Sequence, residues 1–264
     1  MTRVDECDES CPRRVICADR RSVAGSWVSL SLAAGEAVAL LGASGSGKSL
    51  TAAALTGSLP GGSQTSGQLN VSGRDISLAT KHRPGIASVR QDSLTALHPL
   101  VRIDRQLIPV ILRSGGAPTR SAAGSLAVSL LEDVGFANPD RVLGSFPMEL
   151  SGGQRQRVCI VQSLACRSSF LIADEPTTAL DVISQHHVLS ALRKAIGEGA
   201  GVLLITHDVA AAASLCSRAI VISGGSIVDE GSFEYLAAAD RHPEVTHLMG
   251  AAQRTVRRGG TAVA

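Results

Sequence analysis

The eight residues from Gly42 to Ser49 constrain the fold of this chain more than any other segment. They read Gly-Ala-Ser-Gly-Ser-Gly-Lys-Ser, which matches the phosphate-binding loop pattern G-x-x-x-x-G-K-[ST] at every position. Residues 36–41 before the loop form an apolar run typical of a buried strand, and residues 50–59 after it are rich in Ala and Leu and favour a helix. Because the motif requires strand, loop and helix in this order, a flexible Gly/Ser-rich loop is the less favoured alternative.

The chemistry of this loop points to the phosphates of a nucleoside triphosphate. Its glycines allow the backbone to turn tightly and to direct several N–H groups inward, at the start of a helix whose dipole also favours an anion. Lys48 supplies a positive charge for the β and γ phosphates, and the Ser49 hydroxyl is suited to Mg²⁺. We therefore expect the nucleotide-binding residues to include Gly42, Ala43, Ser44, Gly45, Ser46, Gly47, Lys48, Ser49 and Leu50.

A second segment, residues 170–175, predicts a buried strand that ends in two acids. It reads Phe-Leu-Ile-Ala-Asp-Glu. Asp174 at the end of such a strand can present its carboxylate to Mg²⁺, directly or through water. Glu175 points elsewhere and can polarise a water molecule for attack on the γ-phosphate. An apolar run that ends in Asp-Glu is weak evidence by itself, but it becomes strong downstream of a complete phosphate loop.

The third segment is more specific than either of these. Residues 150–154 read Leu-Ser-Gly-Gly-Gln and are followed by Arg-Gln-Arg. With this segment the chain resembles the ATP-binding subunits of ABC transporters, whose signature motif is Leu-Ser-Gly-Gly-Gln. Two glycines ahead of a helix again make an anion site, and Ser151 is also a normal helix N-cap. The resemblance implies that an ATP molecule held by a second subunit is closed in by Ser151, Gly152, Gly153 and Gln154.

The remaining motifs of that family stand in the family's order. Gln91 matches the glutamine that touches Mg²⁺ and senses the membrane partner. Residues 178–181, Thr-Ala-Leu-Asp, match the D-loop that crosses the dimer interface, which places Asp181 at the nucleotide site. His207, which follows an apolar strand, matches the histidine that hydrogen-bonds the γ-phosphate. The resemblance thus implies ATP as the nucleotide, Glu175 and His207 as catalytic residues, and Mg²⁺ bound by Ser49, Gln91 and Asp174.

The family resemblance also implies a fold and a domain plan. We expect an α/β fold of the P-loop NTPase (ABC ATPase) type, with a RecA-like core, an N-terminal antiparallel β subdomain and a helical lobe. We predict a flexible segment over residues 1–20, the ATP-binding domain over residues 21–250 with its helical lobe at about residues 100–165, and a disordered tail over residues 251–264. One helix of the lobe is predicted to bury Leu126, Leu130, Leu131 and Val134.

Composition narrows the location and the possible partners. The net charge of +2 does not indicate a nucleic-acid binder, and the hydrophobic content of 44% suits a globular protein. No uninterrupted apolar run reaches the roughly 18 residues that span a bilayer, and residues 1–14 lack the apolar core of a signal peptide. We therefore expect a peripheral protein at the cytoplasmic face of the cell membrane. Cys7, Cys11 and Cys17 fit no standard metal-binding spacing and are expected to be reduced thiols.

One region departs from the family pattern. The family usually carries an aromatic residue well before the phosphate loop, where it stacks on adenine, but residues 18–22 contain none. Trp27 is the only nearby aromatic residue and is expected in the core. The departure predicts either weaker discrimination between bases or a substitute plane from Arg20 or Arg21.

Residues 91–99, with Ile103 and Gln106 after them, resemble the dipeptide, oligopeptide and nickel import group of the family. Finer features resemble its nickel import subunits. They are the missing adenine aromatic, a chain that ends without the cysteine-containing extension of many peptide-import subunits, and residues 47–51, 59–67, 172–178 and 242–247. We interpret the chain as the ATPase of a nickel importer that contributes no nickel ligand itself. The alternative is the ATPase of a dipeptide or oligopeptide importer.

The resemblance further implies a head-to-tail pair of ATPase subunits, with each ATP between the phosphate loop of one and the signature segment of the other. The implied partners are a second, non-identical ATPase, two transmembrane permease subunits and a solute-binding protein, but no nucleic acid. ABC ATPases of translation or DNA repair usually carry tandem halves or long insertions, and this sequence shows neither. A non-catalytic regulatory subunit is disfavoured because Lys48, Asp174, Glu175 and His207 are intact.

Overall fold

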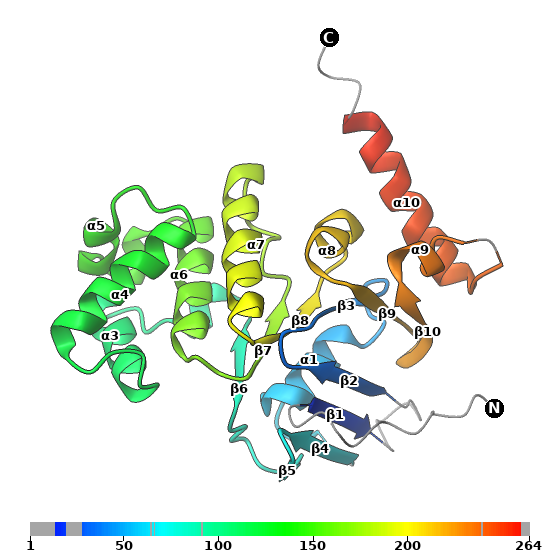
Figure 1. The fold of residues 1–264 in the computed structure, drawn as a ribbon, viewed down its shortest axis with the longest axis horizontal. Coiled ribbons are helices and arrows are strands. Elements are labelled where there is room, and N and C mark those ends of the chain that lie inside the picture. Colours follow the sequence, from blue (N-terminus) through cyan, green and yellow to red (C-terminus); the bar gives the residue numbers. More distant parts are fainter. Residues whose placement is uncertain are drawn as a thin grey trace.

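In the computed structural model, a six-stranded sheet carries the phosphate loop near its centre (Figure 1). The structure describes residues 14–19, 28–63, 65, 67–90, 92–238 and 240–259. The strand order is β10-β9-β3-β8-β7-β6, and neighbours are parallel except β9 and β10, which form a hairpin. The bounds are β3 Ala37–Leu41, β6 Ile86–Val89, β7 Phe170–Asp174, β8 Gly201–Ile205, β9 Arg218–Ser223 and β10 Ser226–Ser232.

A smaller antiparallel sheet lies below α1 in the same view, in the order β2-β1-β4-β5. It is formed by β1 Arg14–Asp19, β2 Ser29–Ala33, β4 Gly67–Val71 and β5 Arg74–Ser77. The antiparallel N-terminal subdomain expected from the sequence is therefore present. The structure differs over residues 14–19, which were expected to be flexible. They pair with β2 on one side and β4 on the other, so their backbone hydrogen bonds are satisfied.

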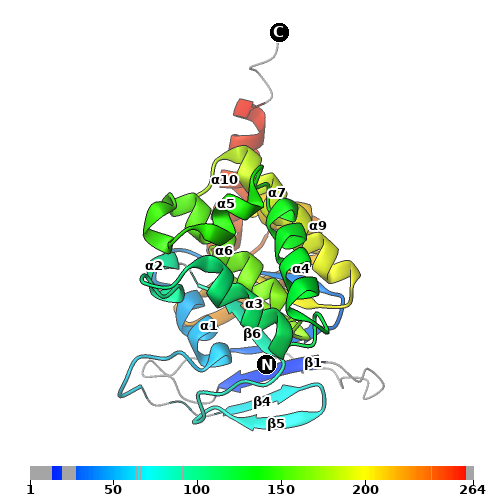
Figure 2. The ribbon, with the colours of Figure 1, turned by 90° about the vertical axis from the view of Figure 1, so that its left-hand side faces the viewer.

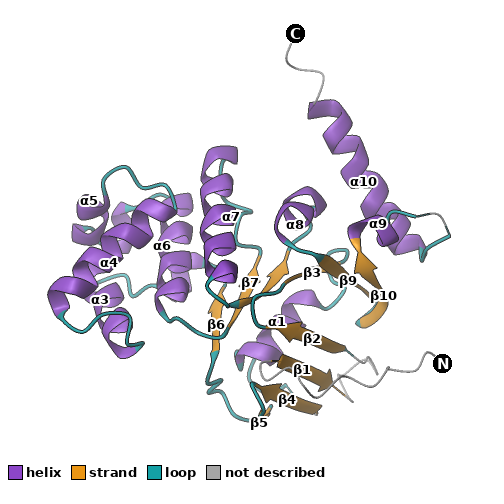
Figure 3. Cartoon of the chain, viewed as in Figure 1, coloured by secondary structure: helices purple, strands orange, loops and turns teal. Residues whose placement is uncertain are grey.

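The helices fall into two groups (Figures 1 and 3). The lobe contains α2 Ser93–Ala96, α3 Ile103–Arg113, α4 Arg120–Asp133, α5 Pro139–Gly144, the 3₁₀ turn η1 Pro147–Glu149 and α6 Gly152–Ala165. The others are α1 Lys48–Thr56, α7 Val182–Gly197, α8 Val209–Leu215, α9 Phe233–Leu236 and α10 Pro243–Gly259. In the part of the chain described, none of these helices has the length and apolar character needed to cross a membrane.

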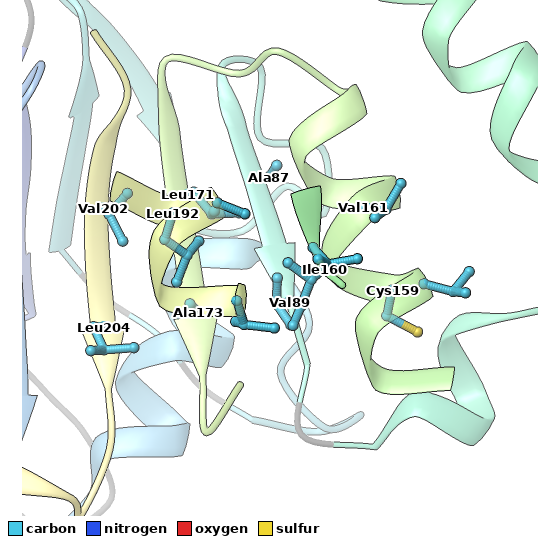
Figure 4. Close-up of a cluster of buried hydrophobic side chains, with 14 of the residues drawn as sticks. Ala87, Val89, Cys159, Ile160, Val161, Leu171, Ala173, Leu192, Val202 and Leu204 are labelled. Atoms are coloured by element: carbon cyan, nitrogen blue, oxygen red, sulfur yellow. The ribbon is translucent and has the colours of Figure 1, made fainter. Parts of the chain in front are cut away.

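Both faces of the central sheet are covered, which explains why its inner strands β3, β7 and β8 are almost entirely apolar and buried. One layer of buried side chains packs between the sheet and helices α6 and α7, and Figure 4 shows part of it, including Ile160, Leu192 and Leu204. The other layer lies between the sheet, α1 and the antiparallel sheet, and includes Leu40, Leu55 and Phe170. In Figure 2 the helices of the lobe face the viewer and the antiparallel sheet lies below them. Packing on both faces thus fixes the positions of the strand ends that carry the functional residues.

The structure corrects two further sequence-based expectations. In α4 the predicted Leu131 and, at its C-cap, Val134 are fully buried, but the rest of the buried face is formed by Ala123 and Ala127, and Leu126 and Leu130 are only partly buried. The small alanines allow close packing of this helix against its neighbours, and a search for large apolar residues misses such a face. The tail was expected to be disordered from residue 251, but α10 continues to Gly259. Its first turns are anchored by Val245 and Met249, which are buried.

Candidate functional site

The phosphate loop leaves the carboxyl end of β3 and enters α1. Glycine is required at Gly42, because a Cβ there would lie 2.3 Å from the Ile222 carbonyl oxygen and 2.6 Å from the Ser46 Oγ. Gly47 is the N-cap of α1 with a φ of 105°, which glycine adopts without strain. The N–H of Gly225, in the β9–β10 hairpin, donates a hydrogen bond of 3.0 Å to the Ser46 carbonyl. The loop is therefore shaped by its glycines and held from outside by the hairpin.

Lys48 folds back over this loop. Its Nζ donates hydrogen bonds of 2.8 Å to the carbonyl oxygens of Gly42 and Ala43, and the residue is buried. Burial lowers the pKa of Lys48, while the charges of Glu175 and Asp174 act in the opposite direction. Neutral carbonyls are weaker partners for an ammonium than phosphate oxygens. The arrangement therefore holds a cation where an anionic ligand can replace the carbonyls.

Asp174 ends β7 beside the start of α1. Burial raises the pKa of Asp174, and the neighbouring charge of Glu175 adds to this effect, whereas a hydrogen bond from the Ser49 side chain and the charge of Lys48 oppose it. The Oδ1 atom of Asp174 is buried and has no hydrogen-bond partner among the described residues. An unpartnered buried carboxylate oxygen next to a hydroxyl provides the hard oxygen ligands that Mg²⁺ prefers. Asp174 and Ser49 therefore fit Mg²⁺.

Glu175 follows at the same edge of the sheet in an unusual backbone conformation. Its φ is 49°, and its N–H donates to the Ile205 carbonyl at 2.9 Å, which fixes it against the end of β8. The Oε1 atom lies 2.9 Å from Nδ1 of His207, and the Thr178 hydroxyl donates to Oε2 at 2.7 Å. The Glu175 side chain is 13% exposed and that of His207 is 67% exposed. The fold thus brings Glu175 and His207 together at the carboxyl ends of adjacent strands.

The signature segment begins α6 with a capping box. The N–H of Gln154 donates to the Ser151 Oγ at 3.2 Å, and the N–H of Ser151 donates to the Gln154 Oε1 at 2.9 Å. Gly153 packs closely on the D-loop, because a Cβ there would lie 3.2 Å from the Ala179 carbonyl oxygen and 3.3 Å from Cδ2 of Leu180. No hydrogen bond among the described residues joins residues 151–154 to the phosphate loop of the same chain. The signature segment therefore contacts the D-loop and lies apart from the loop.

Asp181, at the end of the D-loop, is the N-cap of α7. Its carboxylate accepts hydrogen bonds of 2.9 Å from both the N–H and the hydroxyl of Ser184. These hydrogen bonds lower the pKa of Asp181. Within one chain, the side chain of Asp181 therefore stabilises the helix start.

Several sequence-based predictions fall on residues that the structure does not describe. Gln91 is outside the described residues, as are Arg20, Arg21, Trp27, Cys7 and Cys11, and so is the side chain of Cys17. The strand before Gln91 is tied to the signature helix, because Ser163 Oγ donates to the Ser88 carbonyl at 2.8 Å and Gln156 Nε2 to the Arg90 carbonyl at 3.4 Å. The helix that starts with the signature thus supports the base of the Gln91 segment.

Sequence reasoning missed two contributions to the site. Thr178 was noted only as the first residue of the D-loop, although its hydroxyl binds Glu175. Its position three residues after Glu175, across a tight turn, is the signal that could have indicated the contact. Gly225, in the β9–β10 hairpin, also holds the phosphate loop through its N–H. A contact between residues so far apart in the chain leaves no local pattern.

Comparison with known proteins places the chain in a family. The model of the ABC transporter family matches residues 26–178. The chain is 39% identical over 231 residues to the probable D,D-dipeptide transport ATP-binding protein DdpD of Escherichia coli (strain K12), covering 84% of this chain and 70% of that protein. It is 37% identical over 231 residues to the oligopeptide transport ATP-binding protein AmiE of Streptococcus pneumoniae, covering 84% of this chain and 65% of that protein.

A solved structure supports the same conclusion. The ATP-binding cassette MJ0796, in a dimeric post-hydrolysis state bound to ADP and phosphate, matches with a TM-score of 0.68 and 25% identity, over 83% of this chain and 98% of that one. The predicted fold class is therefore confirmed. Because the family model matches more than half of the chain, and the fold and the sequence agree, this chain belongs to the ABC transporter family as an ATP-binding domain with ATPase activity.

Proposed function

We propose that this chain is the ATPase subunit of an importer of dipeptides or oligopeptides. The observation that carries the proposal is the 39% identity, over 84% of the chain, to a protein described as a probable D,D-dipeptide transport ATP-binding protein. The oligopeptide transport relative points the same way. These relatives favour the peptide alternative over the nickel interpretation. Neither of the two relatives is described as a nickel transport protein. The features that favoured nickel were two missing elements and a few short segments, whereas the identity to the peptide transport relatives extends over most of the chain.

The geometry supports specific roles for the site residues. Residues 42–50 would cradle the triphosphate of ATP, with the Lys48 ammonium exchanging the Gly42 and Ala43 carbonyls for phosphate oxygens. Glu175 would orient a water molecule and accept its proton. His207, beside Glu175 and largely exposed, would donate a hydrogen bond to the γ-phosphate. The Oδ1 atom of Asp174 and the Ser49 hydroxyl would hold Mg²⁺, together with Gln91.

Bound Mg²⁺ would neutralise charge on the phosphate oxygens. The chain's own contribution is to fix the positions of the reacting groups. The Glu175 backbone is tied to β8 through the Ile205 carbonyl, so its carboxylate is anchored next to the phosphate loop rather than on a mobile segment. Such positioning supplies much of the rate in phosphoryl transfer.

The separation of the signature segment from the phosphate loop within one chain supports a second ATPase subunit as partner. Since residues 151–154 lie apart from the phosphate loop of their own chain, they are free to meet the ATP of a second, facing subunit. We propose a head-to-tail dimer, with a non-identical ATPase as the partner, joined to two permease subunits and a solute-binding protein at the cytoplasmic face of the membrane. The domain predicted over residues 21–250, extended by β1 and the rest of α10, would form the working domain, with residues 100–165 as the lobe that meets the permeases.

An uptake experiment tests the substrate. Cells lacking this chain are supplied with the wild type or with Glu175→Gln, and the uptake of a radiolabelled dipeptide and of radioactive nickel is measured in parallel. We expect the wild type, and not the variant, to restore peptide uptake, because transport requires hydrolysis, and we expect nickel uptake to be unaffected. Restoration of nickel uptake alone would return the assignment to nickel and would reject the peptide proposal, while the ATPase assignment would stand.

A further inference from the structure

We propose that Thr178 is a positioning residue that restrains Glu175 in the resting site and releases it when the D-loop moves. This inference rests on the proposed role of Glu175 as the group that activates water. It concerns how the Glu175 carboxylate is held before catalysis, which the sequence motifs do not indicate. Thr178 itself is exposed and touches neither the phosphate loop nor Lys48 in any hydrogen bond of the described residues.

The first step of the argument is that both oxygens of Glu175 are engaged. Oε2 accepts the Thr178 hydroxyl at 2.7 Å, and Oε1 lies 2.9 Å from Nδ1 of His207. The Thr178 hydroxyl occupies a lone pair of Oε2 that an attacking water molecule could otherwise use. It also fixes the direction in which the carboxylate points. In this conformation Glu175 is held by its own chain and is poorly placed to accept a proton from water.

The second step is that the Thr178 restraint is connected to the signature segment. Thr178 is the first residue of the D-loop, and its N–H donates to the Glu175 carbonyl at 3.5 Å. The next two residues, Ala179 and Leu180, supply the atoms on which Gly153 packs. A Cβ at position 153 would crowd both of them, so the signature segment and the D-loop are direct neighbours with little space between them. A displacement at Gly153 is therefore transmitted through two residues to the Thr178 hydroxyl.

The third step links the signature helix α6 to the end of β6, just before Gln91. The helix that begins at the signature is also bonded to the Ser88 and Arg90 carbonyls, just before Gln91. One rigid helix thus contacts the base of the Gln91 segment and, at its first turn, the D-loop. A movement of the lobe would change the Thr178–Glu175 hydrogen bond without any change in the phosphate loop. Thr178 is placed to make the activity of Glu175 depend on the position of the lobe.

The test is steady-state ATP hydrolysis by the importer complex purified through a tag on this full-length chain, comparing Thr178→Val with Thr178→Ser. Valine has the shape of threonine without the donor, and the position is exposed, so the fold should be retained. We expect kcat to rise about tenfold in Thr178→Val, the factor in an equilibrium constant that corresponds to a hydroxyl–carboxylate hydrogen bond. KM for ATP should not change, because the phosphate loop is untouched. Thr178→Ser keeps the hydroxyl and should behave as the wild type.

Further variants separate this inference from the proposed function. The double variant Glu175→Gln with Thr178→Val should remain inactive, since the gain must act through Glu175. If Glu175→Gln alone hydrolyses ATP normally, the proposed role of Glu175 fails and this inference fails with it. If Glu175→Gln is inactive but Thr178→Val has a kcat equal to or below that of the wild type, only the restraint by Thr178 is overturned.

Discussion

Replacement of Glu175 by Gln is expected to lower ATP turnover by about 100-fold to 10,000-fold, the range that general-base catalysis contributes. The amide has nearly the shape of the carboxylate and can still accept the Thr178 hydroxyl, but it cannot take a proton from water. The phosphate loop and Lys48 are unchanged, so ATP binding should persist. The measurements are phosphate release under saturating ATP and equilibrium binding of a fluorescent ATP analogue.

A matched control is available in Glu198→Gln. Glu198 is an exposed glutamate at the end of α7, on a part of the helix remote from its Asp181 N-cap, and its replacement should leave turnover unchanged. Turnover near the wild-type value in Glu175→Gln would show that another group activates the water, and the assignment of Glu175 would have to be abandoned. Loss of ATP binding in the same variant would instead indicate damage to the site as a whole.

Replacement of Lys48 by Ala is the second large expected effect. The Nζ atom is the buried cation of the loop, and two hydrogen bonds to its carbonyls hold it there. Loss of charge-assisted hydrogen bonds to phosphate should weaken ATP binding by about 2–4 kcal/mol, that is, about 30-fold to 700-fold in Kd. Isothermal titration with ATP, in the presence and absence of MgCl₂, measures this change directly.

The control for this variant is Lys81→Ala. Lys81 is an exposed lysine outside the phosphate loop, so its loss removes one positive charge without touching the site. Both variants have the same net charge, and a difference between them reports the position of the charge. Equal ATP affinity in Lys48→Ala and Lys81→Ala would contradict the placement of the triphosphate over residues 42–49.

The motifs of the nucleotide site could be predicted from the sequence alone. The loop from Gly42 to Ser49, the acids after β7 and the helix beginning at Ser151 depend on local residue patterns, since glycines, apolar runs and capping residues act over a few positions. The central sheet and the lobe followed from the same motifs through the family resemblance. Their predicted fold class agrees with the structure and with the comparisons.

Other features depend on contacts between distant residues. The Glu175–His207 contact joins residues from two strands, and the packing of Gly153 on Ala179 joins the lobe to the D-loop. The alanine part of the buried face of α4 was missed because small residues give a weak periodic signal, and the continuation of α10 to Gly259 was missed because its basic and Gly-rich composition was taken as a sign of disorder. The substrate leaves only a weak signal in this sequence, because in the proposed importer the solute would pass through other subunits. The nickel interpretation relied on a few short segments and missing elements, and the relatives do not support it.

The most direct test of the account is a crystal structure of the Glu175→Gln chain with ATP and MgCl₂. We predict that the triphosphate lies over residues 42–49, that Lys48 Nζ leaves the Gly42 and Ala43 carbonyls for phosphate oxygens, and that the metal contacts Asp174. A nucleotide bound elsewhere, with Lys48 still on its carbonyls and the Asp174 Oδ1 still without a partner, would contradict the account.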